Sequence, residues 1–583
     1  MESLDQPTDF STLTRRLQPE RGRLVALGSV LVAAMTLPLL GPWLMGRFVD
    51  LAADGEPAST LVLLAGAFLA VALVADGLQL LVTWLSVRLA WRVGNRLRAD
   101  LCEHALGLDL GWHGEHSAGQ LIERVDGDVD ALTKFSSTAV LNLAGNAVLL
   151  LGTLVVVTAI DWRAGALIAL VTAIAAAVLA RLRKAAVPAR DEEREIQGQL
   201  YGDIEERLGG LEDLRANGAG RWAVHRLHVN SYKWWHVARK AAWRGDGALV
   251  AADVIFAIGS ALVLGLGLVL YRADTITLGT VLALFRYSQL VSEPLWEVAE
   301  QLSEMQKAVA GTRRAARLLA TESAIRDGEG VPLPDGPLAF ELDDVSFGYG
   351  TGRAVLDGVS ITAPAGATVG VVGRTGSGKT TIGRLLARLW DPESGAVRVG
   401  GLDLRDTRQR DLRRRIAVVT QEVEIFRGTL RDNVTMFGTY EAPDGEVVES
   451  LRRVGLGRWF STLPDGLDAH LDGPSELSAG EAQLLAFARV LLADPGLVVL
   501  DEASSRLDPA SEARLAASTE ELLGGRTAVV IAHRLSTLES VDLIVMLDGG
   551  RVVEQGMRAA LVAEPESRYA RLLASERRAR TTA

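Results

Sequence analysis

Long apolar runs with few or no charges occupy the first half of the chain. Residues 24–46 and residues 135–160 contain no Asp, Glu, Lys or Arg, and each run is long enough to cross a bilayer core of about 30 Å as a helix. Further runs cover residues 60–87, 164–180, 246–271 and 278–298. We therefore predict six membrane-spanning helices that form an all-α transmembrane domain.

The first and the last of these runs each admit a second interpretation. The first follows an acidic and then arginine-bearing head and has no small-residue cleavage site close behind it, so we interpret it as a span and not as a signal peptide. The last contains Arg286, Glu293 and Glu297 and could be a soluble helix. An even number of spans returns the chain to the side where it began, which favours a span.

Basic residues mark the side of the membrane on which the connections lie. They cluster before the first run and after the second, fourth and sixth, at Arg15, Arg16, Arg21, Arg23, Arg88, Arg92, Arg96, Arg98, Arg181, Arg183, Lys184, Arg313, Arg314 and Arg317. The alternate connections are short or acidic. Because cytoplasmic connections carry the excess of Lys and Arg, both termini are expected in the cytoplasm of a multi-pass plasma-membrane protein.

Composition excludes some partners and divides the chain unevenly. Hydrophobic residues make up 49% although 23% of residues are charged, because the charges concentrate outside the apolar runs. The net charge of −11 argues against a nucleic-acid partner. Cys102 is the single cysteine, so neither an intrachain disulfide nor a cysteine metal cluster is expected.

The remaining segments suggest the domain boundaries. Residues 88–134 and 181–248 are charged and rich in helix formers, so we expect helices that continue beyond the membrane and not loose loops of that length. Residues 321–337 contain several Gly and Pro and are expected to form a linker. The predicted divisions are a transmembrane domain at 1–320, the linker at 321–337, an α/β domain at 338–578 and a tail at 579–583.

The most specific motif of the second half is a glycine-rich loop. Residues 373–380 match the pattern G-x-x-x-x-G-K-[ST], with a strand predicted before the loop and a helix after it, at 381–390. The glycines allow backbone N–H groups to surround an anion, and the helix N-terminus adds partial positive charge. The loop predicts binding of a nucleoside triphosphate by Gly373, Arg374, Thr375, Gly376, Ser377, Gly378, Lys379, Thr380 and Thr381.

Four side chains in and near this loop have predicted roles. Lys379 supplies positive charge to the β- and γ-phosphates, and the Thr380 hydroxyl is a candidate Mg²⁺ ligand. A second apolar strand, at residues 497–500, ends in two carboxylates. Asp501 would hold Mg²⁺ directly or through water, and Glu502 would polarise the attacking water.

Together these motifs resemble the ATP-binding cassette (ABC) transporters, and nearly the whole chain resembles an exporter-type half-transporter. The resemblance implies that Tyr349 stacks on adenine, that Gln421 senses Mg²⁺ and contacts the membrane domain, and that His533 is the switch histidine. It also implies that a signature motif acts on the ATP bound by a partner subunit. The loop after the strand at residues 497–500 would act on the same ATP. These trans-acting residues are Ser478, Ala479, Gly480, Glu481 and Asp508. Residues 116–124 with 126–130, and residues 211–222, resemble the two cytoplasmic coupling segments.

The signature motif departs from the usual Leu-Ser-Gly-Gly-Gln. Ala479 replaces a glycine, and its Cβ would either block the close approach of a phosphate or cost about 1–2 kcal/mol if φ must be positive. Glu481 adds negative charge near a polyphosphate. Arg506 replaces a small residue. The residues that act on the chain's own ATP are intact. This asymmetry suggests a heterodimer with a different half-transporter, with harmless drift in a homodimer as the alternative.

Three functions remain open at this point. The first is export of a small or amphipathic molecule by alternating access, with membrane lipid around the protein. The second is import by an exporter-like fold, for example of a siderophore. The third is a soluble cassette ATPase, which the predicted spans and the acidic charge make improbable. Asp76, Asp253 and Arg286 could contact the substrate, pair with each other or face a wet cavity.

Overall fold

The computed structural model describes residues 21–135, 137, 140–350, 352–473, 476–501, 509–532 and 535–582. The chain divides into two compact units. The first comprises Met1–Leu106 and Ala118–Thr321, and the second comprises Gly107–Ser117 and Glu322–Ala583. Residues 107–117, which lie between helices of the first unit in the sequence, therefore belong structurally to the second unit.

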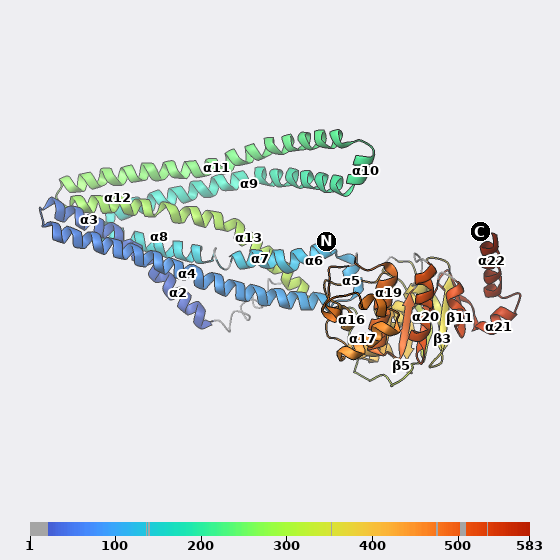
Figure 1. Ribbon diagram of the computed structural model, residues 1–583. Coiled ribbons are helices and arrows are strands. Elements are labelled where there is room, and N and C mark those ends of the chain that lie inside the picture. Colours follow the sequence, from blue (N-terminus) through green and yellow to red (C-terminus); the bar gives the residue numbers. More distant parts are fainter. Residues whose placement is uncertain are drawn as a thin grey trace. The chain divides into compact units, whose positions relative to one another are not determined.

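The first unit is entirely helical in the residues that the model describes. Three of its helices are very long, and α9 and α11 run side by side to a tip that carries α10 (Figure 1). Its helices are α2 (Arg21–Thr36), α3 (Leu40–Ala53), α4 (Ala58–Leu106), α6 (Ala118–Ile122), α7 (Asp128–Lys134), α8 (Val140–Ile160), α9 (Trp162–Gly209), α10 (Leu211–Ala216), α11 (Gly220–Arg272), α12 (Leu278–Leu290) and α13 (Ser292–Ala320).

The long helices confirm that the cytoplasmic connections are helical. Helix α4 has 49 residues and α11 has 53. At 1.5 Å per residue these helices are more than twice as long as a bilayer core is thick. Residues 88–106 and most of residues 181–248 therefore continue the spans as helix instead of forming loops.

Among the described residues, five helical segments are long and apolar enough to span a membrane: Gly22–Ala53, Ala58–Leu106, Asn142–Ile160, Trp162–Gly209 and Gly220–Arg272. The predicted sixth span is divided, because α12 ends at Leu290 and α13 begins at Ser292. Pro294 lies just after the division, and a proline ring clashes with the carbonyl four residues earlier, at Leu290. The charges of α13 also lower its hydropathy below that of the other spans.

Close backbone contact joins α3 to α12 in the helical unit. A Cβ on Gly279 would lie 1.9 Å from the Gly46 carbonyl oxygen, so α3 and α12 meet where neither residue has a side chain. Asp50 accepts hydrogen bonds from the Gly279 N–H and the Thr277 hydroxyl, both at 2.7 Å. The Tyr287 hydroxyl donates to the Leu39 carbonyl at 2.6 Å. These contacts hold α12 beside α3 although the two are far apart in the sequence.

The second unit is an α/β domain with two main sheets. The antiparallel sheet has the order β2-β1-β4-β5, and the larger sheet has the order β12-β11-β3-β10-β9-β6. The strands are β1 (Phe340–Phe347), β2 (Leu356–Ala363), β3 (Thr368–Gly373), β4 (Ser394–Val399), β5 (Leu402–Asp403), β6 (Ile416–Val419), β9 (Leu497–Asp501), β10 (Thr527–Ile531), β11 (Leu543–Asp548) and β12 (Arg551–Met557), with a small pair β7 (Gly428–Thr429) and β8 (His470–Leu471).

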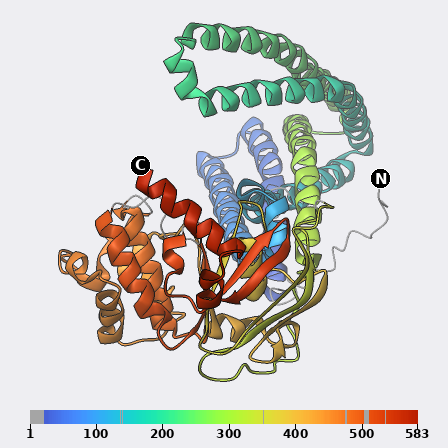
Figure 2. The same cartoon turned by 90° about the vertical axis from the view of Figure 1, so that its right-hand side faces the viewer.

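Helices cover the larger sheet on both faces, so its central strands are completely buried. In Figure 2 the orange helices gather on one side of the strands. The helices of this unit are α5 (Leu110–Glu115), α14 (Lys379–Leu386), α15 (Gln409–Arg415), α16 (Leu430–Thr435), α17 (Asp444–Arg453), α18 (Gly457–Phe460), α19 (Ala479–Ala493), α20 (Pro509–Leu523), α21 (Arg558–Ala563) and α22 (Arg568–Thr582).

Two hydrophobic cores result, one on each face of the larger sheet. Phe487 of α19 belongs to the core that contains Val498 and Leu500. Leu385 of α14 belongs to the other core, which reaches the antiparallel sheet at Val345. Alternate residues of β9 contribute to opposite cores, as expected for a strand that is buried on both faces.

Candidate nucleotide site

The loop between β3 and α14 has a backbone that requires glycine at two positions. Gly376 and Gly378 have φ values of +82° and +101°, a region that side-chain-bearing residues rarely adopt. A Cβ on Gly378 would also lie 2.5 Å from the Leu356 side chain. The loop turns through a hydrogen bond from the Ser377 N–H to the Arg374 carbonyl, at 3.1 Å. Its glycines therefore form a cradle that a side chain would fill, which fits the close approach of a polyphosphate.

Lys379 begins α14 and folds back over this loop. Its Nζ donates to the carbonyls of Gly373, at 2.7 Å, and Arg374, at 3.2 Å, and the residue is only 5% exposed. The ammonium group is thus held beside the cradle by the loop itself. Thr380 follows in the first helical turn and is half-buried. The structure places Lys379 and Thr380 where a phosphate chain with a bound cation would need them.

The strand order brings the other predicted residues to the same edge of the sheet. Strand β10 is parallel to both β3 and β9, and Ile531 is level with Val371 on one side and Asp501 on the other. Asp501 is the last residue of β9, and Gln421 lies two residues beyond β6, which pairs in parallel with β9. Ligands of parallel sheets bind at the carboxyl ends of the strands, where these residues meet the glycine-rich loop.

Three predicted site residues, Glu502, Asp508 and His533, lie outside the described residues. Glu502 follows Asp501 directly in the sequence, and His533 is two residues beyond the end of β10. Their roles remain predictions from the sequence.

Tyr349 contacts the helix that follows the phosphate loop. Its hydroxyl lies 3.1 Å from the Thr381 hydroxyl and accepts a hydrogen bond from Arg384, also at 3.1 Å. The Arg384 guanidinium carbon lies 5.7 Å from the centroid of the Tyr349 ring and 5.4 Å from that of Trp390. Sequence reasoning missed Arg384 and Trp390. The position of Arg384 one turn after Thr380 was a usable signal, because residues four apart share a helix face.

The signature motif forms a capped helix N-terminus. Ser478 is the N-cap of α19, and its hydroxyl accepts from the Glu481 N–H at 3.3 Å. The Glu481 carboxylate accepts in return from the Ser478 N–H, at 2.9 Å, and from the Ser478 hydroxyl, at 2.7 Å. The Glu481 carboxylate therefore accepts the Ser478 hydroxyl proton and places a negative charge of the same chain at the helix N-terminus.

The strain cost that depended on a positive φ at Ala479 does not arise. Ala479 begins α19 and is not among the residues with positive φ, so its methyl group causes no backbone strain. The departure that has a structural consequence is Glu481.

The first predicted coupling segment, at residues 116–124 and 126–130, stays a prediction. Of the connection that contains it, residues 107–117 belong to the second unit. There Asp109 caps α5 by accepting from the Trp112 N–H at 2.9 Å. Residues 118–130 belong to the helical unit. The part of this connection that joins the second unit is therefore α5 and its flanks.

A polar side-chain contact joins two more of the predicted spans. The Asn146 amide donates to the Glu297 carboxylate at 2.9 Å, joining α8 to α13. Such a hydrogen bond between helices is a typical role of an amide side chain in a membrane span. Arg286 bonds to Gln289 on its own helix, and Asp76 and Asp253 are exposed on this chain.

Comparisons with known proteins give one consistent result. Residues 24–295 match the family model described as "ABC transporter transmembrane region", and residues 356–505 match the one described as "ABC transporter". An ATP-dependent lipid A-core flippase of Thiobacillus denitrificans is 32% identical, over 83% of this chain and 84% of that protein. A multidrug efflux ATP-binding/permease protein of Mycobacterium bovis is 33% identical over 98% of this chain, which spans 48% of that protein. An uncharacterized ABC transporter ATP-binding protein of Bacillus subtilis is 29% identical over 97% of this chain.

Proposed function

We propose that this chain, which belongs to the ABC transporter family, is an exporter subunit whose ATP site is completed by a different half-transporter. A transmembrane region fused to an ATP-binding domain makes the protein a multi-pass membrane protein that couples ATP hydrolysis to transport. The direction of transport, the partner and the roles of individual residues are the parts that we propose.

Each residue of the chain's own nucleotide site has a separate proposed role. ATP, when bound with Mg²⁺, supplies a phosphoanhydride bond whose hydrolysis is favourable. Lys379 and the loop N–H groups would hold the phosphates, and Tyr349 would support the adenine. Thr380, Gln421 and Asp501 are the oxygen donors that would hold Mg²⁺, a set that suits this hard cation. Glu502 would orient the water, with His533 beside it.

Export is the direction that the relatives favour. The two relatives with informative names are an efflux protein and a flippase. We therefore propose that the chain moves a small or amphipathic molecule, or a lipid, away from the cytoplasm. In inside-out vesicles an exporter should accumulate a fluorescent amphipathic dye when ATP is added. ATP-dependent release of preloaded dye from the same vesicles would instead indicate import.

The capping contact between Glu481 and Ser478 carries the proposal of a different partner. In this family the signature helix N-terminus faces the phosphate bound by the other subunit. Here a carboxylate already occupies the Ser478 hydroxyl and neutralises the helix terminus. The Glu481 carboxylate would therefore repel a negatively charged phosphate at the helix N-terminus, which would otherwise attract it. Two copies of this chain would therefore form two poor sites, whereas a partner with the usual signature would complete the site at Lys379.

This proposal predicts that the chain alone hydrolyses ATP slowly and without cooperativity in lipid nanodiscs. The double variant Ala479→Gly with Glu481→Gln should raise the rate by about 10-fold, since about 1.4 kcal/mol of repulsion would be removed. Glu446→Gln, an exposed glutamate in the first turn of α17, is the matched control. Robust cooperative hydrolysis by the unmodified chain alone would refute the heterodimer.

A further inference from the structure

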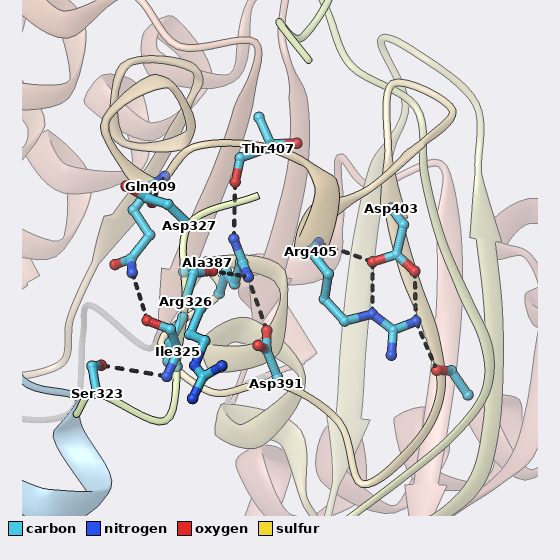
Figure 3. Close-up of polar contacts among 12 residues, drawn as sticks. Ser323, Ile325, Arg326, Asp327, Ala387, Asp391, Asp403, Arg405, Thr407 and Gln409 are labelled. Atoms are coloured by element: carbon cyan, nitrogen blue, oxygen red, sulfur yellow. Dashed lines mark hydrogen bonds and ion pairs between the residues drawn. The ribbon is translucent and has the colours of Figure 1, made fainter. Parts of the chain in front are cut away.

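Residues 322–331, the first part of the predicted linker and called the linker from here on, belong to the second unit. They are hydrogen-bonded to the rest of that unit along their length. Figure 3 shows Ser323, Ile325, Arg326 and Asp327 of the linker beside Thr407 and Gln409. The Gln409 N–H donates to Asp327 at 2.8 Å, and the Gln409 amide donates to the Ile325 carbonyl at 3.2 Å. The Gly330 N–H donates to the Asp406 carbonyl at 3.1 Å. The linker is thus an ordered part of the domain, not a flexible tether.

Arg388 joins this linker to the end of the phosphate-loop helix. It lies two residues beyond the last residue of α14, is 2% exposed and has a φ of +47°, which is rare for a residue with a side chain. Its guanidinium donates to the carbonyls of Arg326, at 2.7 Å, and Thr407, at 2.9 Å. It also pairs with Asp391 at 3.1 Å. One side chain therefore connects three separate segments, and surrounding contacts hold it in an unfavourable backbone conformation.

The other side of the linker is bonded to α5. Asp109 accepts from the linker Ala324 N–H at 2.8 Å while it also caps α5. Burial alone would raise the pKa of Asp109, but the N–H groups of Ala324 and Trp112 outweigh it, so the pKa is lowered and the carboxylate stays charged. A Cβ on Gly111 would lie 3.6 Å from Trp390, so α5 also rests against the segment that follows Arg388.

We propose that Arg388 is a positioning residue that transmits the nucleotide state of the phosphate loop to α5 through the linker. Helix α14 is a short rigid rod of about 12 Å, with Lys379 at one end and the Arg388 turn just past the other. A displacement at its N-terminus on phosphate binding moves Arg388, which moves the Arg326 carbonyl, the linker and, through Asp109, α5. The proposal rests on the proposed transport function, in which α5 must respond to ATP.

Hydrogen–deuterium exchange on the full chain in nanodiscs tests this path without knowledge of the substrate. Adding MgATP should slow exchange at residues 374–381 and change exchange at residues 110–116 by about 3-fold or more. In Arg388→Lys, which keeps the charge but cannot reach all three partners, the response at 374–381 should remain and that at 110–116 should disappear. Asp109→Ala should give the same pattern. Glu521→Gln, which breaks the exposed ion pair with Arg453, is the control and should behave as the unmodified chain.

The outcomes separate the inference from the function on which it rests. A response at 110–116 that survives in both variants overturns the role of Arg388 and the linker. Loss of the response at 374–381 in Arg388→Lys also overturns it, because the residue would then merely support the nucleotide site. If exchange behaves as expected but proteoliposomes of the paired complex show no ATP-driven transport, the path stands and the proposed function fails.

Discussion

Replacing Lys379 by alanine is expected to weaken ATP binding by about 100-fold. The Lys379 ammonium is buried beside the phosphate cradle and is held there by the carbonyls of Gly373 and Arg374. A charge-assisted hydrogen bond to a phosphate contributes about 1.5–3 kcal/mol, and every 1.4 kcal/mol is a factor of ten in affinity. The variant also removes a buried cation beside the cradle, so the lost binding energy should fall at the upper end of that range.

The measurement is titration of the purified protein with a fluorescent ATP analogue in nanodiscs. Arg410→Ala is the matched control, because it removes one positive charge from an exposed position on α15. A parallel thermal-unfolding measurement without nucleotide separates loss of binding from loss of folding. Unchanged affinity in a folded Lys379→Ala protein would contradict the assignment of this loop.

The elements that the sequence predicted best are those with strong local patterns. Strand β9 differs from the predicted 497–500 by one residue, and β3 precedes the phosphate loop as predicted. Their apolar runs are buried on both faces, so pattern and environment agree. The helix after the phosphate loop is shorter than predicted, because α14 ends at Leu386 and the turn at Arg388 has a positive φ. That turn depends on the distant carbonyls of Arg326 and Thr407, which no local pattern reveals.

In the candidate site too, features set by neighbouring residues were predictable, whereas contacts between distant residues were not. The phosphate loop is fully specified by spacing, and the capping of Ser478 by Glu481 could have been predicted from the pattern S-x-x-E. The contacts of Asp109 with the linker and of Asn146 with Glu297 could not, because each joins residues more than 100 positions apart. The divided sixth span had a visible local cause in Pro294, which the hydropathy of the run concealed.

Replacing Glu502 by glutamine is expected to preserve ATP binding and to lower turnover by about 100- to 1000-fold. Asp501 ends β9 at the edge where the phosphate loop lies, and Glu502 follows it directly in the sequence. Glutamine keeps the size but cannot accept a proton from the attacking water, and general-base catalysis contributes about 10²–10⁴-fold. Phosphate release from the paired complex measures the rate, and the ATP-analogue titration confirms binding. Near-normal turnover would refute the base assignment.

The same variant distinguishes the two possible assemblies by the number of working sites. In a heterodimer whose partner lacks an equivalent carboxylate, Glu502→Gln leaves no competent base, so the residual rate should be near background. In a homodimer, differently tagged normal and variant chains would form mixed dimers that retain one complete set of groups. Tandem affinity purification isolates those mixed dimers. Substantial ATP hydrolysis by the mixed dimers would favour the homodimer. The heterodimer is supported if mixed and normal homodimers are both inactive while the complex with the second half-transporter is active. The altered signature at Glu481 would then explain why a second protein is needed.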